Sequence, residues 1–368
     1  MSQALATRIE NLQDLCVARL RDCLDPGSGR FGRQIRDGVW APTWGTESLT
    51  SSAICVIGLH RAGIPPRTVV ADAAALCRNL AAGLRDEAYP GALGLVLWAN
   101  SAVRGAAPVA LLAEAGFSPD ELEPVLPGLT TMEVAWLVSG LLHADVPALR
   151  PATIAALREL EGRLDRETLV FRHASAAAPL RHRLRRQIAN FADQIYPLQA
   201  LSFAALVLGD ASRRQLADHC GARVVAAQGP LGQWWWHHDA ANGAVAEAYP
   251  VYSVHQHSMA PMALRALALA GGHAHVAAVA RSRAWLHANE LGLDLVEPAS
   301  GIIWRSVERE ESAAAHRLRQ ACLLAGLPTP EPASPQFRLN REIRPYEWGW
   351  LLYATAIEGS TPPAGHIL

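Results

Sequence analysis

Residues 47–60 read ESLTSSAICVIGLH and residues 67–84 read RTVVADAAALCRNLAAGL, and the contrast between these neighbouring segments decides the fold. The first is apolar or small almost all round, so a helix built from it has no polar face and must be buried on every side. The second carries a charged stripe, which is typical of a helix with one face in water and the other against a core. The pair predicts one inner helix followed by one outer helix.

The same contrast recurs along the whole chain. Further segments without a polar face lie at 91–103, 132–143, 197–208, 260–270 and 346–356. Further segments with a charged stripe lie at 5–24, 148–164, 212–227, 275–290 and 310–325. About six alternations at spacings of roughly 40–60 residues are typical of helical-pair repeats. The sequence therefore predicts an all-α fold, an (α/α)6 toroid of alternating outer and inner helices, in a single domain spanning residues 1–368.

Short stretches with turn residues separate the outer from the inner helices. They lie at 25–35, 165–173, 234–249 and 294–304, and Asn242-Gly243 is a strong tight-turn signal. Antiparallel helix pairs in a ring place these connections on one face, together with the inner-helix N-termini. We therefore expect short β-hairpins on that face and the functional site beside them.

Tyrosine next to proline marks several predicted inner-helix starts, because proline in a first helical turn loses no hydrogen bond. The pairs are Tyr89-Pro90, Tyr196-Pro197 and Tyr249-Pro250, with Pro345-Tyr346 as the inverted form. Packing at the helix entry is one interpretation of these tyrosines. The other is that some of them point into the mouth of a central cavity.

The composition limits the partners and the compartment. Half of the residues are hydrophobic, 18% are charged and the formal net charge is −1, which gives ample core and no long-range field for nucleic acid or an anionic membrane. The six cysteines form no CxxC pair and resemble buried thiols. The first residues do not resemble a signal peptide, and no apolar run is long enough for a membrane span. We expect a cytoplasmic protein.

Residues 228–262 hold the densest group of aromatic and titratable side chains. Buried imidazoles and phenols need hydrogen-bond partners, so a packed core does not require so many together. A functional site is the favoured interpretation and a structural plug is the alternative. The expected substrate-binding residues here are Trp234, Trp235, Trp236, His238, Asp239, Tyr249 and His257, and the expected catalytic residues are Tyr252 and His255.

Four carboxylates lie within about one turn of predicted inner-helix starts, where the helix dipole favours negative charge. They are Glu47, Glu133, Asp193 and Glu347. Charge complementarity at the helix ends is the simple explanation. Because the four belong to different helices of one ring, they could also converge on the cavity, and a carboxylate pair is what glycosidic bond hydrolysis needs. All four are candidate catalytic residues, since the sequence selects no pair.

Other residues near the same face complete the candidate site. Trp44 and Tyr346 are expected to bind substrate at the cavity rim, and Arg344, with Arg36 and Arg305, could hold a uronate carboxylate in a bidentate fork. A surface ion pair is the alternative for each arginine. The histidines at 255 and 257 could bind a metal with His237 or His238, but no third ligand has motif spacing, so we predict neither a metal nor another cofactor.

Two resemblances bear on function. Gln228-x-x-x-Gly232-x-Trp234 resembles the QxxxGxW repeat of squalene–hopene cyclases and related terpenoid cyclases, which are α/α toroids, although the chain has one copy and no DxDD acid motif. The predicted architecture resembles six-hairpin glycosidases, glucuronyl hydrolases, polysaccharide lyases and uronyl epimerases. Residues 232–262 also resemble bacterial proteins of polysaccharide gene clusters, in which an aspartate is expected where this chain has His257, so no carboxylate-based role is expected there.

The preferred functional prediction is a carbohydrate-active enzyme, a hydrolase, lyase or uronyl epimerase that acts on a small-molecule or oligosaccharide substrate by general acid/base catalysis. A terpenoid cyclase that stabilises a carbocation with aromatic rings is one alternative. A non-catalytic binding or scaffold toroid is another, since one fold hosts several functions. An open cavity with carboxylates favours a sugar, a closed apolar one favours a prenyl chain, and a filled one favours a scaffold.

Overall fold

The computed structural model describes residues 13–43, 45–327, 329 and 335–358, and 57% of it is helical. Strands occur only as short antiparallel pieces in the described ranges. The all-α prediction is confirmed.

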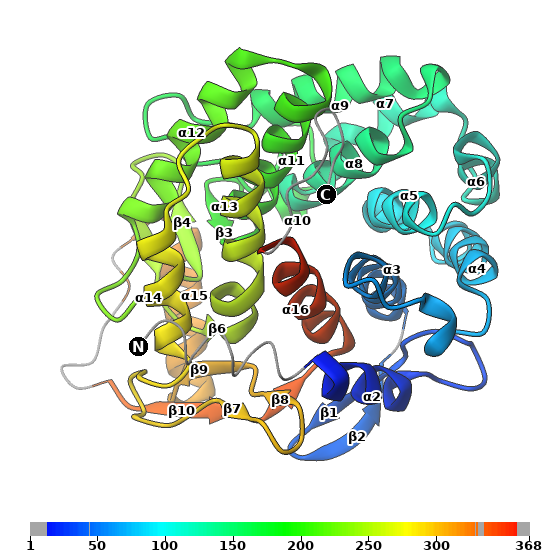
Figure 1. Cartoon of the computed structure of the whole chain (residues 1–368). Helices are drawn as coiled ribbons and strands as arrows, with labels where there is room; N and C mark the ends of the chain where they lie inside the picture. The colour runs from blue at the N-terminus through cyan, green and yellow to red at the C-terminus, as the bar shows by residue number, and fades with distance from the viewer. Residues whose placement is uncertain (1–12, 44, 328, 330–334, 359–368) are drawn as a thin grey trace.

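Six helices stand side by side as an inner ring (Figure 1). They are α3 (Thr46–Arg61), α5 (Leu93–Ala102), α8 (Thr131–Ala144), α11 (Ala192–Leu208), α13 (Ala260–Leu269) and α16 (Pro345–Glu358). Each packs against the next in this order, and α16 packs against α3, so the last inner helix closes the ring on the first. These are the segments that lack a polar face in the sequence, and most of their residues are buried.

Amphipathic helices surround this ring. They are α2 (Gln13–Cys23), α4 (Ala73–Asp86), α9 (Arg150–Gly162), α12 (Ala211–Ala226) and α14 (Val276–Trp285). Between α5 and α8 the outer layer consists of α6 (Pro108–Glu114) and α7 (Leu122–Val125), which the sequence analysis did not predict. Prolines at 108, 119, 124 and 127 divide this stretch into pieces too short to show helical periodicity. With this pair the toroid has outer and inner helices in alternation, as predicted.

The predicted outer helix at 310–325 forms as α15 (Ala313–Leu324) but belongs to the strand-bearing face. Its buried Arg319 pairs with Glu247 of β5 (Val245–Glu247), and Gln320 Nε2 donates to the same carboxylate at 3.0 Å. The helix therefore packs against the hairpin that contains β5 instead of covering the ring of inner helices.

The strands lie in connections that lead into inner helices. One sheet joins β11 (Glu342–Ile343), β1 (Arg33–Arg36) and β2 (Val39–Pro42); a second joins β3 (Ile188–Asn190), β4 (His237–Asp239) and β5; a third joins β10 (Phe337–Asn340), β9 (Ser306–Arg309) and β6 (Val251–Tyr252); and β7 (Val296–Glu297) pairs with β8 (Ile302–Ile303). The hairpins predicted at 234–249 and 294–304 are confirmed as β4–β5 and β7–β8. In the stretches at 25–35 and 165–173 the turns are closed by single bridges, Leu24 to Phe31 and Leu164 to Phe171.

The remaining helical pieces are short. They are α10 (Leu180–Arg183), the 3₁₀ turns η1 (Pro66–Thr68), η2 (Pro90–Ala92), η3 (Pro119–Glu121), η4 (Leu126–Gly128) and η5 (Pro147–Leu149), and the π-helical turn η6 (His255–Met259), which runs into α13.

Glycines set the closest approaches within the inner ring. A Cβ at Gly58 of α3 would overlap the carbonyl oxygen of Gly349 in α16, and one at Gly140 of α8 would overlap the carbonyl oxygen of Gly94 in α5. At both places backbone packs against backbone, where no other residue fits. Two neighbouring pairs of inner helices are therefore held in close contact by residues without side chains.

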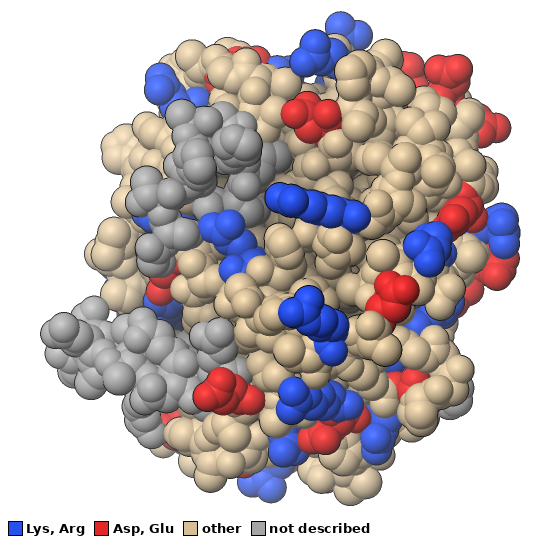
Figure 2. Space-filling model, turned by 45° about the vertical axis from the view of Figure 1, so that its right-hand side comes forward, with Lys and Arg blue, Asp and Glu red and all other residues tan. Residues whose placement is uncertain are grey.

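No helix among the described residues is long and apolar enough to cross a bilayer. On the face shown in Figure 2, basic and acidic side chains are interspersed with uncharged surface, in keeping with the formal net charge of −1. Such mixing leaves this face without an extended field of one sign.

Replacing Gly58 by alanine should lower the free energy of unfolding by about 3 kcal/mol, because two rigid backbones must separate to admit the methyl group. The matched control is Gly162→Ala in the last turn of α9, where nothing lies within 4 Å of the added Cβ. That change should be neutral or stabilising by up to about 1 kcal/mol. Chemical denaturation of the two variants measures both effects, and equal stabilities would contradict backbone contact as the constraint on ring closure.

Candidate active site

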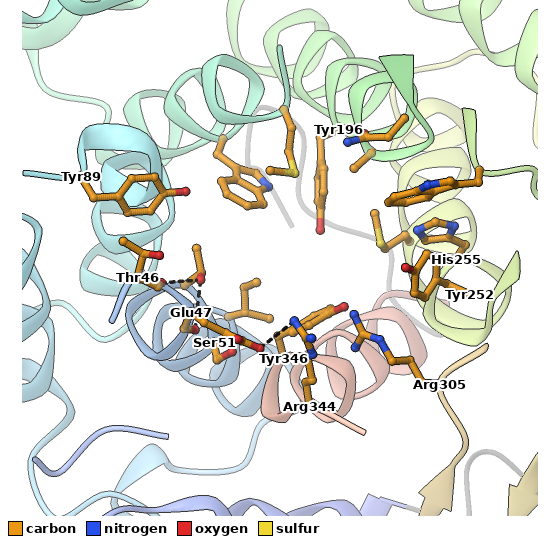
Figure 3. A pocket seen from close by; sticks show the side chains of 18 residues that line it. Thr46, Glu47, Ser51, Tyr89, Tyr196, Tyr252, His255, Arg305, Arg344 and Tyr346 are labelled. Carbon is orange, nitrogen blue, oxygen red and sulfur yellow. Dashed lines mark hydrogen bonds and ion pairs between the residues drawn. The ribbon is translucent and has the colours of Figure 1, made fainter. Parts of the chain in front are cut away.

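A cavity of about 380 Å³ opens at the N-terminal ends of the inner helices (Figure 3). Its walls come from all parts of the ring. They are formed by Thr46, Glu47, Thr50, Ser51, Ile54, Tyr89, Met132, Trp136, Asn190, Ala192, Tyr196, Trp236, Tyr252, His255, Met259, Arg305, Arg344 and Tyr346. The predicted site face is thus hollow and lined by both aromatic and polar groups.

One wall is an aromatic cluster around His255. The imidazole lies 4.6 Å from the ring of Phe191, 5.2 Å from Tyr252 and 6.0 Å from Trp236, with the Trp236 ring nearly parallel to it. His255 begins the π-helical turn η6, and such turns often occur at functional sites. The cluster fixes the imidazole at the cavity wall, and no acidic side chain among the described residues binds it.

Burial controls the protonation of this wall. It lowers the pKa of His255 to about 3, with the positive charge of Arg305 acting in the same direction. Its Nδ1 is buried and has no hydrogen-bond partner among the described residues. Burial raises the pKa of the Tyr252 phenol, an effect that Arg305 partly offsets. At neutral pH the histidine is uncharged and the tyrosine keeps its proton.

Two arginines enter the cavity beside this wall, and their surroundings differ. Arg305 is 8% exposed, binds Glu347 Oε1 through Nη1 at 2.7 Å, and lies 5.1 Å from the Tyr252 ring centroid. Burial opposes its charge, but Tyr346 and Glu347 outweigh that effect and raise the pKa of Arg305.

Arg344 is more open to solvent than Arg305. It pairs with Glu47 at 2.7 Å and with Glu342 at 2.6 Å, and its side chain is 26% exposed. In Figure 3 the Glu47–Arg344 pair lies at the cavity edge. An ion pair in such a position contributes little stability and can be exchanged.

The opposite wall carries hydroxyl groups. Figure 3 shows two phenols directed into the cavity, that of Tyr89 from the residue before η2 and that of Tyr196 from α11. Tyr89 Oη donates to Glu133 Oε1 at 2.9 Å, and burial together with this carboxylate raises the pKa of Tyr89. Asn190 at the end of β3 lies nearby on the cavity wall.

Of the four predicted carboxylates, Glu47 lines the cavity and three lie behind its wall. Glu133 accepts from the backbone N–H of Thr130 at 2.7 Å, and Asp193 accepts from the backbone N–H of Met132 at 3.0 Å and pairs with His173. Glu347 accepts from the backbone N–H of Arg344 at 3.1 Å besides holding Arg305. The expected convergence of four carboxylates on the cavity is therefore corrected: helix-end amides, His173 and Arg305 hold three of them away from the cavity.

Among the other candidates, Trp236, Tyr252, His255, Arg344 and Tyr346 meet at the cavity. The remaining ones that the structure describes lie elsewhere, so their expected place on the rim is corrected, and Trp44 lies outside the described residues. Trp234 is buried against Phe191, Trp235 packs on Tyr249, His238 pairs within the β3–β4 ladder, Asp239 caps the β4–β5 turn, Tyr249 Oη donates to Glu290 at 2.6 Å, and His257 bonds Ser258 Oγ at 2.6 Å.

Some cavity residues were not assigned from the sequence. Trp136, Met132 and Asn190 carry no motif signal: the first two lie in a segment predicted as a buried helix, and the sequence analysis made no prediction for the segment that contains Asn190. Tyr89 and Tyr196 had a signal in the Tyr-Pro repeat, and both enter the cavity together with Tyr346. Tyr249, which carries the same signal, does not.

Among the described residues, no three His, Cys, Asp or Glu side chains are grouped so as to hold a metal ion. The two histidines that the sequence analysis considered as metal ligands lie apart: the imidazole of His255 faces the cavity and that of His257 is buried outside it.

Comparison with known proteins identifies the fold. No protein-family model and no curated protein matches the chain. Among solved structures it is similar to an unsaturated glucuronyl hydrolase specific for heparin (12% identity, 97% of each chain, TM-score 0.55) and to unsaturated glucuronyl hydrolases from Streptococcus agalactiae (9% identity, 99% and 93% of the chains, TM-score 0.59) and Bacillus sp. GL1 (12% identity, 97% and 96%, TM-score 0.56). This likeness shows that the chain has the (α/α)6 toroid fold.

The stability of the protein should fall as the pH falls below 6.5. Burial lowers the pKa of His255 and His257 to about 3 and that of His238 to about 4. Below pH 6.5 the unfolded chain therefore binds protons at these histidines, while the folded protein keeps them neutral. Each such histidine should remove up to about 1.4 kcal/mol per pH unit between pH 6.5 and its folded pKa.

Denaturant unfolding at pH 6.5, 5.5 and 4.5 measures this slope. The variant His255→Gln should reduce the slope by about one proton's contribution, because glutamine does not titrate. A free energy of unfolding that stays constant over this range would show that these imidazoles are solvated or paired in solution.

Proposed function

We propose that the protein is a carbohydrate-active enzyme that acts on a uronate-containing sugar, by proton transfer at the carbon next to the carboxylate. The observation that carries this proposal is the meeting of Tyr252, His255 and two arginines at one wall of the cavity. A volume of about 380 Å³ lies in the range of small-ligand sites and leaves room for a sugar residue. Similar solved structures act on glucuronyl groups, which supports the same class of substrate here.

Elimination or epimerisation fits the described side chains better than glycosidic bond hydrolysis does. Hydrolysis by the common mechanisms needs two carboxyl groups facing the bond. Glu47 is the carboxylate that the described part of the cavity wall presents, and Glu133 reaches the cavity only through Tyr89. Removal of the proton next to a uronate carboxylate instead needs a base, an acid and a cation to hold the carboxylate.

The side chains supply these three roles. Arg344 takes the substrate carboxylate, because its partly exposed pair with Glu47 costs little to exchange, whereas separating the buried Arg305–Glu347 pair leaves an uncompensated buried charge. The uncharged His255 accepts the proton from the carbon next to the carboxylate. In an elimination Tyr252 donates a proton to the leaving oxygen, and in an epimerisation it donates one to the opposite face of that carbon. Arg305 stabilises the negative charge that develops on the substrate.

The alternatives fit the cavity less well. A carbocation in a terpenoid cyclase would lie beside Arg305 and Arg344, whose charges repel it. A scaffold would fill the centre of the ring with its own side chains, whereas this centre is hollow. We also propose the cytoplasm as the compartment, since the cysteines among the described residues are free thiols and all but Cys322 are buried.

The variants Tyr252→Phe and His255→Gln should each lower kcat/KM on uronate oligosaccharides by about 10²–10⁴, the usual loss for a positioned acid or base. The matched control is Tyr249→Phe, which removes a phenol from the same segment but outside the cavity, where it donates to Glu290. Its turnover per folded molecule should stay within about twofold of the parent, although its thermal midpoint should fall.

The assay follows formation of the conjugated 4,5-unsaturated uronate by ultraviolet absorbance and exchange of the C5 hydrogen by NMR. Activity that survives both Tyr252→Phe and His255→Gln would remove these residues from the mechanism. Release of reducing sugar with neither signal would favour hydrolysis.

A further inference from the structure

The segment between α9 and β3 carries a cluster of positive charge. Residues 181–186 read RHRLRR, so four of six residues are arginine, although the chain as a whole has a net charge of −1. Arg181 and Arg183 are exposed, and Arg185 and Arg186 are half-buried. We call residues 181–186 the arginine loop.

The side-chain contacts of the arginine loop include no carboxylate among the described residues. Within the described part of the chain, its recorded side-chain contacts are to histidines: Arg181 Nε donates to His182 Nε2 at 3.0 Å, and Arg185 Nη2 lies 2.9 Å from His237 Nε2. The Nε of Arg186 is buried without a hydrogen-bond partner among the described residues. The positive charge of this loop is therefore not neutralised by neighbouring carboxylates.

The loop borders the cavity. It runs directly into β3, whose last residue, Asn190, lines the cavity wall. The His182 ring lies 5.5 Å from that of His173, and His173 binds Asp193 at the start of α11. On the other side, Arg185 contacts His237, whose ring is 4.8 Å from the cavity residue Trp236. Through these contacts the arginine loop lies one layer of side chains from the cavity.

We propose that the arginine loop binds the anionic part of an oligosaccharide that extends out of the cavity, so that the preferred substrate is an acidic chain and not a single uronate sugar. This inference rests on the proposed function. A cavity of about 380 Å³ encloses only the end of such a chain, and the next carboxylate or sulfate groups must lie at the rim. Guanidinium forks match these groups in geometry, and unpaired cations beside a cleft raise the rate of encounter with anions.

The test compares disaccharides and hexasaccharides prepared from hyaluronan, alginate and polygalacturonate, with binding measured by titration calorimetry at 50 and 200 mM salt. The variant R181Q/R183Q removes the two exposed arginines of the loop. The matched control R78Q/R214Q removes two exposed arginines from the outer helices α4 and α12 and changes the net charge equally.

For whichever of the three polysaccharides gives oligosaccharides that bind, the hexasaccharide should bind the parent protein more tightly than the disaccharide. R181Q/R183Q should weaken the hexasaccharide about fivefold at 50 mM salt and less at 200 mM, while the disaccharide is unaffected and R78Q/R214Q changes neither. Equal affinity of both lengths for the parent, or equal losses in the two double variants, would overturn the proposal while leaving the proposed function intact. Failure of every disaccharide to bind would instead remove the proposed function, and this inference with it.

Discussion

Close contact between inner helices is the constraint on which the rest of the structure depends. Gly58 against Gly349 and Gly94 against Gly140 allow backbones to touch, so six helices close into one ring around a narrow centre. Because an outer helix returns the chain between successive inner helices, every inner helix begins on the same face, where the strands also lie (Figure 1). Residues more than 290 positions apart, such as Glu47 and Arg344, therefore meet as an ion pair.

Helix ends and the cavity compete for the same carboxylates. Each helix start offers unpaired backbone N–H groups that an acidic side chain in the first turn can satisfy. Glu133 and Asp193 bind such amides, and Glu347 adds the buried Arg305, so these three define the wall from behind. Glu47 accepts no helix-end amide in the described structure and turns to Arg344 at the cavity edge. Of the four carboxylates, three therefore have the structural role, and Glu47 is the one that remains a candidate for a functional role.

Sequence patterns predicted the parts of the fold that depend on periodicity. The inner helices stand out because burial on all sides removes polar residues at every position, as at 132–143. The outer pair α6–α7 was missed because prolines interrupt its pattern. The site was predicted to within a face, but composition does not say which way a side chain points: of three consecutive tryptophans, Trp236 reaches the cavity and Trp234 enters the core. Residues 233–236 precede β4 and do not form a regular strand, so these two tryptophans, two positions apart, do not share one side as they would in a strand.

Removal of water from the cavity wall shifts the pKa values of both residues in the proposed proton transfer, His255 and Tyr252. Burial disfavours the charged form of any group, and so acts in opposite directions on an acid and a base. It lowers the pKa of His255, which stays an acceptor, and raises that of Tyr252, which stays a donor, although their rings lie 5.2 Å apart. A substrate carboxylate entering the same space would raise the pKa of His255, because its negative charge favours the protonated imidazole, and for the same reason it would keep the Tyr252 phenol protonated. In the proposed mechanism the anionic substrate therefore makes His255 a stronger base, while Arg305 and Arg344 hold that substrate in the cavity.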